Sequence, residues 1–357
     1  MTEYWGFGRS EPGRFAEHAR ADEADGWDGL VFTDSQNLRP DVFVVMATAL
    51  AATSRLKVTP GVSNPVTRHP AVSASAMAAL QAESGGRASY GIGRGDSALA
   101  YIGQAPASMA VFETYVRHVQ SYLSGGRVPF EELLREGADI STLELGDQPS
   151  DSWVRWLDPD VPKVPVEVIA TGPKAIGVGG RHADIVTFTV GADLERIAWG
   201  IDTARAAAVE AGRDPAELRF GVYVNVACHP DLPTARTLVS GGLASFSRFS
   251  AMHGKPVGPL SGGAEHVVRQ IRDRYDMKHH GEPESAQTET LTDDFVDRFA
   301  VVGGPDRFRE RVAEIVALGI DRVVMTIPNQ ATRERYPDET TVAHQHLVRD
   351  VLPRLPR

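Results

Sequence analysis

Short apolar runs alternate along the chain with longer segments in which hydrophobic residues recur at helical spacing. The short runs are typical of buried strands, and the longer segments are typical of amphipathic helices. Helices are expected, for example, at residues 40–54, 70–84 and 192–212. Strands that alternate with helices indicate a parallel sheet. Strands are predicted at residues 4–8, 29–34, 56–62, 88–93, 164–171, 184–190, 219–228 and 321–327.

Eight such strands, each next to a helix, predict a (β/α)8 TIM barrel rather than an open doubly wound sheet. We expect the chain of 357 residues to form a single domain, residues 1–357. A typical barrel needs ~250 residues. The surplus falls in two irregular segments, about 125–163 and 231–300, which we interpret as insertions that shape a pocket. The first is equally consistent with a solvated excursion from the scaffold.

Composition narrows the class of function. A net charge of -10 argues against a non-specific nucleic-acid binder, which needs a basic face. The single cysteine, Cys228, fits a reducing compartment. The sequence has no signal-peptide pattern at its start and no apolar stretch of membrane-spanning length. We therefore expect a cytoplasmic protein with a small-molecule substrate, without nucleic-acid or membrane partners.

In a barrel, residues just beyond the strands face the active-site mouth. Asp34 follows the second predicted strand and is the carboxylate best placed for chemistry. It is interpreted either as a proton donor or hydrogen-bond partner of a substrate or cofactor ring, or as a loop-capping residue. Glycines near the mouth let a ligand approach the backbone, whose N–H groups bind anions. The mouth positions are 34–37, 61–64, 93–96, 170–174, 189–191 and 225–229.

Two glycine-containing loops are candidate anion sites. "GIGRGDS" (91–97) fails as a dinucleotide fingerprint because its last position, residue 96, is aspartate. It is either a plain strand-to-helix turn, with Asp96 or Ser97 as N-cap, or a phosphate cradle with Arg94 as counter-charge. Thr171-Gly172 precedes Pro173 and is either an anion-binding helix N-terminus or an ordinary helix start.

Other chemistries find no support in the sequence. The histidines form no metal-binding motif, so no metal is expected. His69, before a proline, is interpreted as a loop residue or helix N-cap. No G-x-S-x-G motif occurs, and Cys228 ends an apolar strand, where a buried inert thiol is expected.

Several of these segments together resemble the luciferase-like flavin and deazaflavin oxidoreductases. They are most similar to the coenzyme F420-dependent branch, including methylenetetrahydromethanopterin reductase-like proteins. The resemblance spans nearly the whole chain. It rests on "GVSNPVTRHP" (61–70), "GGRASYGIGRGDS" (85–97), "ATGPKA" (170–175), "GGRHAD" (179–184) and "GGPDRFRERVAEIVALGIDRVVM" (303–325).

The resemblance implies a TIM barrel, often dimeric, that holds a flavin or deazaflavin at the carboxyl-terminal mouth. A homodimer is therefore expected. In many family members a bulge after the third strand, with a non-prolyl cis peptide, supports the cofactor ring. That bulge maps to Gly61, Val62 and Ser63, with Asn64 beside it. The phosphate region maps to Gly93, Arg94, Gly95, Ala170, Thr171, Gly172 and Pro173.

The implied reaction is hydride transfer between coenzyme F420 and a small organic substrate, with Asp34 near the reactive face. F420-linked sugar dehydrogenases carry a histidine just beyond the second strand. This chain has Asp34-Ser35-Gln36 there, which argues against a sugar-phosphate substrate. One alternative is an FMN-dependent monooxygenase supplied by a partner flavin reductase. Another is a non-catalytic barrel that only binds a flavin-like ligand.

Overall fold

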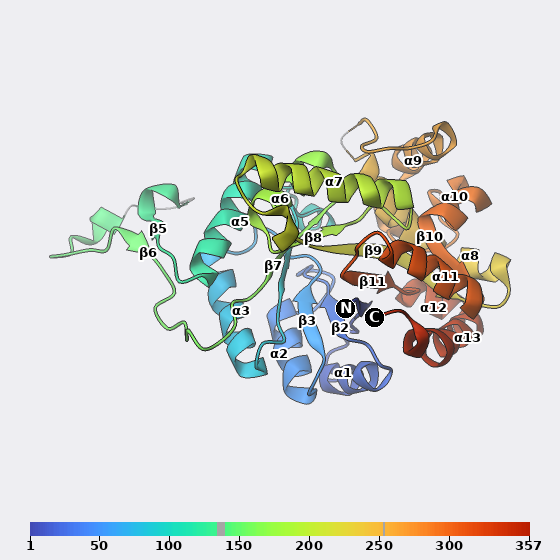
Figure 1. Ribbon diagram of the computed structural model, residues 1–357, viewed down its shortest axis with the longest axis horizontal. Helices are drawn as coiled ribbons and strands as arrows, with labels where there is room; N and C mark the ends of the chain where they lie inside the picture. Colours follow the sequence, from blue (N-terminus) through green and yellow to red (C-terminus); the bar gives the residue numbers. More distant parts are fainter. Residues whose placement is uncertain (134–139, 253) are drawn as a thin grey trace.

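A ring of parallel strands surrounded by helices forms the body of the molecule (Figure 1). The computed structural model describes residues 1–133, 140–252 and 254–357. The main sheet contains β1 (Glu3–Phe7), β2 (Gly29–Phe32), β3 (Lys57–Pro60), β4 (Tyr90–Ile92), β7 (Val166–Ala170), β8 (Ile185–Phe188), β9 (Arg219–Cys228), β10 (Ala300–Gly303) and β11 (Arg322–Thr326). Its order is β3-β2-β1-β11-β9-β8-β7-β4, with β10 paired to β9. The predicted (β/α)8 barrel is confirmed.

The helices lie on the outside of this ring (Figure 1). Several start as their sequences predict: α3 has Pro70 in its first turn, and the His69 ring accepts a hydrogen bond from the Ala71 N–H as N-cap. The helices are α1 (Phe15–Ala24), α2 (Val42–Ala52), α3 (Pro70–Ser84), α4 (Ser97–Ala100), α5 (Met109–Leu123), α6 (Pro173–His182), α7 (Leu194–Glu210), α8 (Leu232–Ser247), α9 (Gly262–Arg274), α10 (Asp293–Phe299), α11 (Pro305–Val316), α12 (Gln330–Arg335) and α13 (Pro337–His346).

The barrel closes between β3 and β4 through two isolated bridges rather than a continuous ladder. Val58 pairs with Ala88, and Ser63 pairs with Ile92. Between these bridges the Gly91 N–H donates to the Thr59 hydroxyl at 3.0 Å, instead of to a backbone carbonyl. The backbone therefore leaves the regular ladder after Val58 and meets β4 again at Ser63, directly before the mouth of the barrel; residues 61–63 of this stretch are called the bulge below.

β10 was not predicted from the sequence. It is only four residues long and pairs with the last four residues of β9, from Asn225 to Cys228, beyond the part of β9 that pairs with β8, Arg219–Val222. A short apolar run directly after a helix is indistinguishable from the end of that helix, so periodicity alone did not separate the two.

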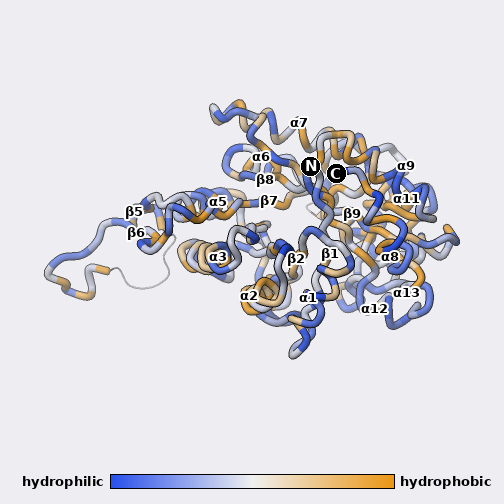
Figure 2. The backbone as a smooth tube through the Cα atoms, turned by 60° about the horizontal axis from the view of Figure 1, so that its bottom comes forward, coloured by the Kyte–Doolittle hydropathy of each residue, from blue (hydrophilic) through white to orange (hydrophobic). Residues whose placement is uncertain are grey.

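The barrel interior is apolar in its middle and charged at its floor. Trp5, Val31, Tyr223 and Val324 form a buried cluster inside the ring. At the floor, Arg322 forms a buried ion pair with Glu167 and lies 3.8 Å from the Trp5 ring centroid. The larger hydrophobic core lies between the strands and the helices, and the tube in Figure 2 is hydrophobic along these segments.

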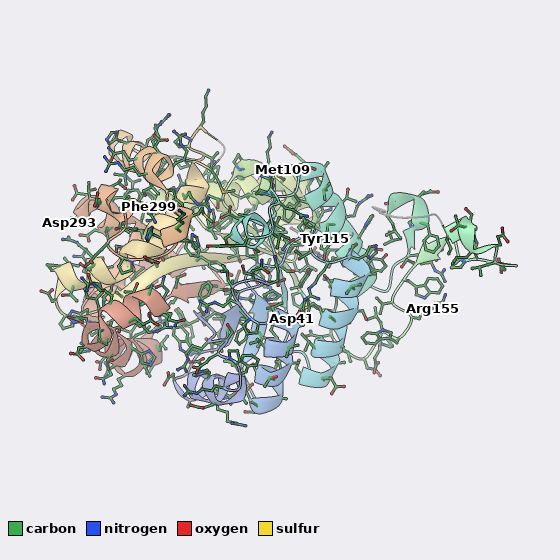
Figure 3. The ribbon with its side chains drawn as sticks, turned by 180° about the vertical axis from the view of Figure 1, so that it is seen from behind. Asp41, Met109, Tyr115, Arg155, Asp293 and Phe299 are labelled. Atoms are coloured by element: carbon green, nitrogen blue, oxygen red, sulfur yellow. The ribbon has the colours of Figure 1, made fainter. Side chains whose placement is uncertain are left out.

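The described residues of this insertion, 125–133 and 140–163, do not form a wall of the mouth, contrary to one of our two interpretations. They connect the end of α5 to the start of β7, so they leave the barrel at its amino-terminal face. A short hairpin, β5 (Val128–Pro129) with β6 (Asp151–Ser152), belongs to an arm that projects from the body (Figure 1). Arg155, on this arm, lies on the opposite side of the molecule from Asp293 and Phe299 (Figure 3). Residues 134–139 lie outside the described residues.

Two further features of the described residues bear on function. Among them, no helix is both long and apolar enough to span a bilayer. The same part of the chain holds no group of three or more histidine, cysteine, aspartate or glutamate side chains arranged to bind a metal.

Candidate active site

Asp34 lies two residues beyond β2, at the carboxyl-terminal mouth of the barrel. Its side chain is buried, and its Oδ2 accepts a hydrogen bond of 2.8 Å from the Ser63 hydroxyl. Ser63 belongs to the bulge after β3, the neighbour of β2 in the sheet. Within the described residues this is the one hydrogen bond to the Asp34 carboxylate, so Oδ1 is available to a ligand.

Burial raises the pKa of Asp34 above its ordinary value, because a buried carboxylate loses the hydration of its charge. The hydrogen bond from Ser63 and the nearby Arg68 guanidinium act in the opposite direction and lower it. The rise prevails. A carboxyl group of this kind keeps its proton to a higher pH than an exposed aspartate and can deliver it to a bound molecule.

The bulge that carries Ser63 is packed tightly against the barrel interior. A Cβ at Gly61 would lie 1.9 Å from Val31 Cγ1 and 2.9 Å from the Tyr223 hydroxyl, so only glycine fits. The peptide bond between Gly61 and Val62 is cis, as the resemblance implied. Gly61 thus lies against Val31 and Tyr223 of the buried cluster inside the barrel.

Asn64 holds the loop after the bulge. Its Oδ1 accepts hydrogen bonds from the N–H groups of Val66 and Thr67, at 3.0 and 3.1 Å. Its Nδ2 is buried and has no partner among the described residues. Since a buried amide without a partner is costly, this group is suited to donate to a bound ligand.

The loop after β4 lies against the bulge. A Cβ at Gly93 would lie 3.0 Å from Val62 Cγ2, and one at Gly95 would lie 3.3 Å from Asn64 Cβ. The Nε of Arg94 donates a hydrogen bond of 2.7 Å to the Ala107 carbonyl, so part of the guanidinium is directed at the chain between α4 and α5. Arg94 therefore orders the chain between α4 and α5, which limits the counter-charge role expected for it.

The predicted cap at Asp96 is wrong in one respect. Asp96 occupies the position before α4, but its carboxylate makes no capping hydrogen bond. Instead it forms an ion pair with Arg248, whose guanidinium offers a full opposite charge.

Ala170, Thr171, Gly172 and Pro173 form the second candidate anion site, at the start of α6. Gly172 is the N-cap and makes no side-chain cap, and a Cβ there would meet only Val257, at 3.9 Å. The Thr171 hydroxyl bonds to the Thr189 hydroxyl at 2.5 Å, which links the ends of β7 and β8. The first N–H groups of α6 are thus positioned to bind an anion.

The segment from 246 to 259, within the described residues, crosses the mouth. Phe246 stacks on Tyr223 with ring centroids 6.0 Å apart, Arg248 reaches Asp96, and Val257 approaches Gly172. The expectation that the segment after β9 shapes the pocket agrees with these contacts. Residue 253 lies outside the described part of the chain.

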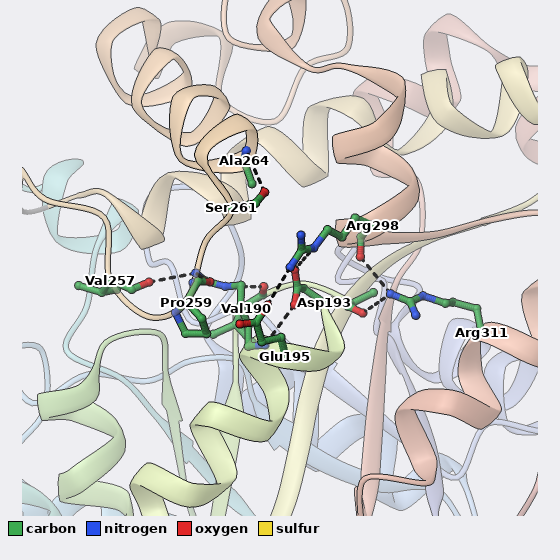
Figure 4. A network of polar contacts seen from close by, with 11 residues as sticks. Val190, Asp193, Glu195, Val257, Pro259, Ser261, Ala264, Arg298 and Arg311 are labelled. Atoms are coloured by element: carbon green, nitrogen blue, oxygen red, sulfur yellow. Dashed lines mark hydrogen bonds and ion pairs between the residues drawn. The ribbon is translucent and has the colours of Figure 1, made fainter.

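The fully buried Arg196 on α7 anchors this crossing segment. Its Nη1 donates to the carbonyls of Val257 and Pro259, both at 3.0 Å, and its Nη2 donates to the Ser250 hydroxyl at 2.9 Å. Figure 4 shows the surrounding network, in which Arg298 pairs with Asp193 and Glu195. The cover of the mouth is therefore built on a rigid base.

Sequence reasoning placed Ser35 among the mouth positions but missed two other polar groups there, Tyr223 and Thr326. Among the described residues, the buried hydroxyls of Ser35, Tyr223 and Thr326 have no hydrogen-bond partner. All three lie on or just beyond barrel strands, as does Asn64. Tyr223 could not be recognised from the sequence because it lies within an apolar strand. Thr326 was not recognised because no mouth positions were assigned after the last strand.

These features match a known family. A model of the luciferase-like monooxygenase family matches residues 5–322. The chain belongs to this family. The expected family is thereby confirmed.

Named relatives and a solved structure agree with this placement. A 5,10-methylenetetrahydromethanopterin reductase of Methanolobus tindarius is 24% identical over 90% of this chain and 92% of its own length. An F420-dependent glucose-6-phosphate dehydrogenase of Beutenbergia cavernae is 26% identical over 82% of this chain and 80% of its own. The solved coenzyme F420-dependent tetrahydromethanopterin reductase of Methanopyrus kandleri superposes with a TM-score of 0.72 at 21% identity, over 100% of both chains.

Proposed function

We propose that this protein is a coenzyme F420-dependent oxidoreductase that transfers a hydride between the deazaflavin ring and a small organic substrate. The observation that carries the proposal is the buried Asp34, held by Ser63 beside the bulge at the barrel mouth. The names of the two curated relatives, a methylenetetrahydromethanopterin reductase and an F420-dependent dehydrogenase, support the same chemistry.

The mouth fits a cofactor of this kind. The bulge at residues 61–63 presents backbone next to Tyr223 of the barrel interior. The Nδ2 of Asn64, which has no partner among the described residues, can donate a hydrogen bond to the cofactor, and the Ser35 hydroxyl can donate or accept one. The start of α6 at Gly172 offers free N–H groups for a phosphate. We assign the ring to the bulge, and the phosphate to the turn before α6 and the loop at Gly93–Gly95.

When bound, the deazaflavin supplies a hydride at ring carbon C5, so the protein needs no nucleophile of its own. The described residues agree: burial raises the pKa of the Cys228 thiol to about 12, which keeps it inert. Asp34 holds the proton that accompanies the hydride when the substrate is reduced. Ser63 fixes the carboxyl group so that Oδ1 faces the mouth.

The segment from 246 to 259 excludes water and selects the substrate. Phe246 and Phe249 pack edge to face, with ring centroids 5.9 Å apart, and give this cover an apolar inner surface. An apolar or heteroaromatic substrate suits such a surface better than a phosphorylated sugar.

We also propose that two copies associate through α2 and α3. Val44 on α2 and Val72 on α3 are 57% and 54% exposed, which is unusual for two valines on neighbouring helices. Both helices are hydrophobic along most of their length in Figure 2. Sedimentation of the wild type against a Val44→Lys, Val72→Lys double variant tests this: a dimer that becomes a monomer supports it, and an unchanged mass contradicts it.

A substrate screen tests the proposed chemistry. The pure protein with reduced or oxidised F420 is offered pterins, secondary alcohols and sugar phosphates, while the absorbance of the oxidised deazaflavin is followed. Turnover that Asp34→Asn lowers by about 10²-fold or more, with KM little changed, supports the proton-donor role. Turnover that Asp34→Asn leaves untouched removes Asp34 from the site.

A further inference from the structure

A cavity of about 230 Å³ lies between the outside of the barrel wall and the helices, near the carboxyl ends of β1, β9 and β11. It is enclosed by the strands β1, β2 and β9 on one side and by α1, α12 and α13 on the other. None of the residues assigned to the cofactor lines it. Its walls are largely apolar, made by Phe7, Trp27, Leu30, Val226, Ile327 and Leu347.

One end of the cavity is charged. Arg9 and Arg333, both exposed to solvent, line its rim together with Asp22. Arg9 Nη2 lies 2.8 Å from Asp22 Oδ1. Arg333 Nη1 donates to the Pro328 carbonyl at 2.6 Å, and within the described residues no carboxylate lies within ion-pair distance of its guanidinium.

Asp22 provides an independent sign of a ligand. The residue is only 7% exposed, and its Oδ2 has no hydrogen-bond partner among the described residues. Burial raises its pKa to about 6, so a share of the molecules carries the proton near neutral pH. When ionised, Asp22 offsets one of the two guanidinium charges and leaves one; when protonated, it offers a donor. An anion bound beside the protonated form of Asp22 pairs with the unmatched guanidinium charge and accepts the hydrogen bond that Oδ2 then donates.

We propose that this cavity binds a small monocarboxylate with an apolar body of about six to ten carbon atoms, since a cavity of ~150 Å³ already holds benzene. The ligand carboxylate would pair with the Arg333 guanidinium and accept a hydrogen bond from the protonated Asp22 Oδ2, and the apolar body would lie against Trp27 and Leu30. The site is separate from the mouth, so it does not depend on the proposed function.

Ligand-observed fluorine NMR with 4-fluorophenylacetate tests this on the full chain. The neutral 2-(4-fluorophenyl)ethanol serves as a matched probe without the charge. Arg333→Met removes the guanidinium, whereas Arg335→Met, on the same helix but paired with Glu284 and outside the cavity, is the matched control. Ala343→Leu fills the cavity, and its melting temperature shows whether it folds. Because Arg333 is exposed, Arg333→Met tests the proposal even if Ala343→Leu does not fold.

We expect the acid to bind about tenfold more tightly than the alcohol, with or without added F420. Arg333→Met is expected to remove that preference, Arg335→Met to retain it, and a folded Ala343→Leu to abolish binding of both probes. Absence of binding at about 10 mM, equal binding of acid and alcohol, or an effect of Arg335→Met as large as that of Arg333→Met would each overturn the proposal.

Discussion

The Ser63 hydroxyl donates a 2.8 Å hydrogen bond to the Asp34 carboxylate, which joins the bulge after β3 to the end of β2. These residues are 29 positions apart in the sequence and meet because their strands are neighbours in the barrel. The contact couples the backbone expected to support the cofactor ring to the group expected to hold a proton. The pKa of Asp34 therefore depends on Ser63.

Removing this donor is expected to shift the pH dependence of turnover. The hydrogen bond from Ser63 favours the ionised form of Asp34, so Ser63→Ala raises the pKa of Asp34 further. If the protonated carboxyl is the active form, the basic limb of the profile of kcat against pH moves to higher pH. Asp34→Asn should abolish that limb, and Glu83→Gln, an exposed acid on α3, should leave it in place. A basic limb that Ser63→Ala leaves unmoved would contradict the coupling.

Gly61 is expected to tolerate no side chain. A methyl group there would lie 1.9 Å from Val31 Cγ1, so Gly61→Ala must displace the bulge or the barrel wall, at a cost of about 1–3 kcal/mol of unfolding free energy. Gly172→Ala is the matched control, because its Cβ meets only Val257 at 3.9 Å. Urea unfolding should show a loss for the first variant and little change for the second. Equal stabilities would refute the assigned packing.

Removing one partner of the ion pair at the barrel floor is expected to cost more stability than removing both charges. Arg322→Met leaves the buried Glu167 carboxylate without its guanidinium, which typically costs about 3–5 kcal/mol. The double variant Arg322→Met, Glu167→Gln removes the unpaired charge and should recover much of that loss. Thermal unfolding of both variants measures the difference. A double variant less stable than Arg322→Met would show that the charge is not the cause.

Asp22 is expected to make stability fall as pH rises. Its pKa is raised from 3.8 to about 6 in the folded protein. The stabilising contribution is full below the unfolded value and is lost as pH rises through the folded value, with a total of about 3 kcal/mol at 1.36 kcal/mol per unit. Asp22→Asn should therefore gain stability relative to the wild type between about pH 5 and pH 7.5. Urea unfolding at about pH 5 and about pH 7.5 measures this difference. A variant that loses stability relative to the wild type as the pH rises over this range would contradict the raised pKa of Asp22.

The barrel was predictable because strand and helix periodicities alternate cleanly from residue 3 to residue 123, from residue 166 to residue 228 and from residue 305 to residue 326. Asp34 and the two glycine loops were found because the positions after parallel strands face one mouth, whereas the bulge was expected from the family resemblance. The arm at 125–163 was placed less well. Its composition indicated an insertion. The barrel face from which it projects, however, depends on whether it follows a strand or a helix, and it follows the helix α5.

The contacts that complete the site could not be predicted from the sequence. Arg248 meets Asp96 across 152 positions, and Arg196 holds the Val257 carbonyl across 61. Neither pair carries a local pattern, because side chains brought together by the fold need share no spacing along the chain. The partnerless hydroxyl of Tyr223 was likewise hidden within an apolar strand.

A direct titration of the pure protein with coenzyme F420 and, separately, with FMN tests the central claim. Fluorescence of each cofactor reports its binding, and Gly172→Ala serves as a folded variant with a side chain at the expected phosphate site. We predict that F420 binds at micromolar concentration, about tenfold or more tightly than FMN, and that Gly172→Ala weakens it. Absence of F420 binding at tens of micromolar, or tighter binding of FMN, would contradict the account.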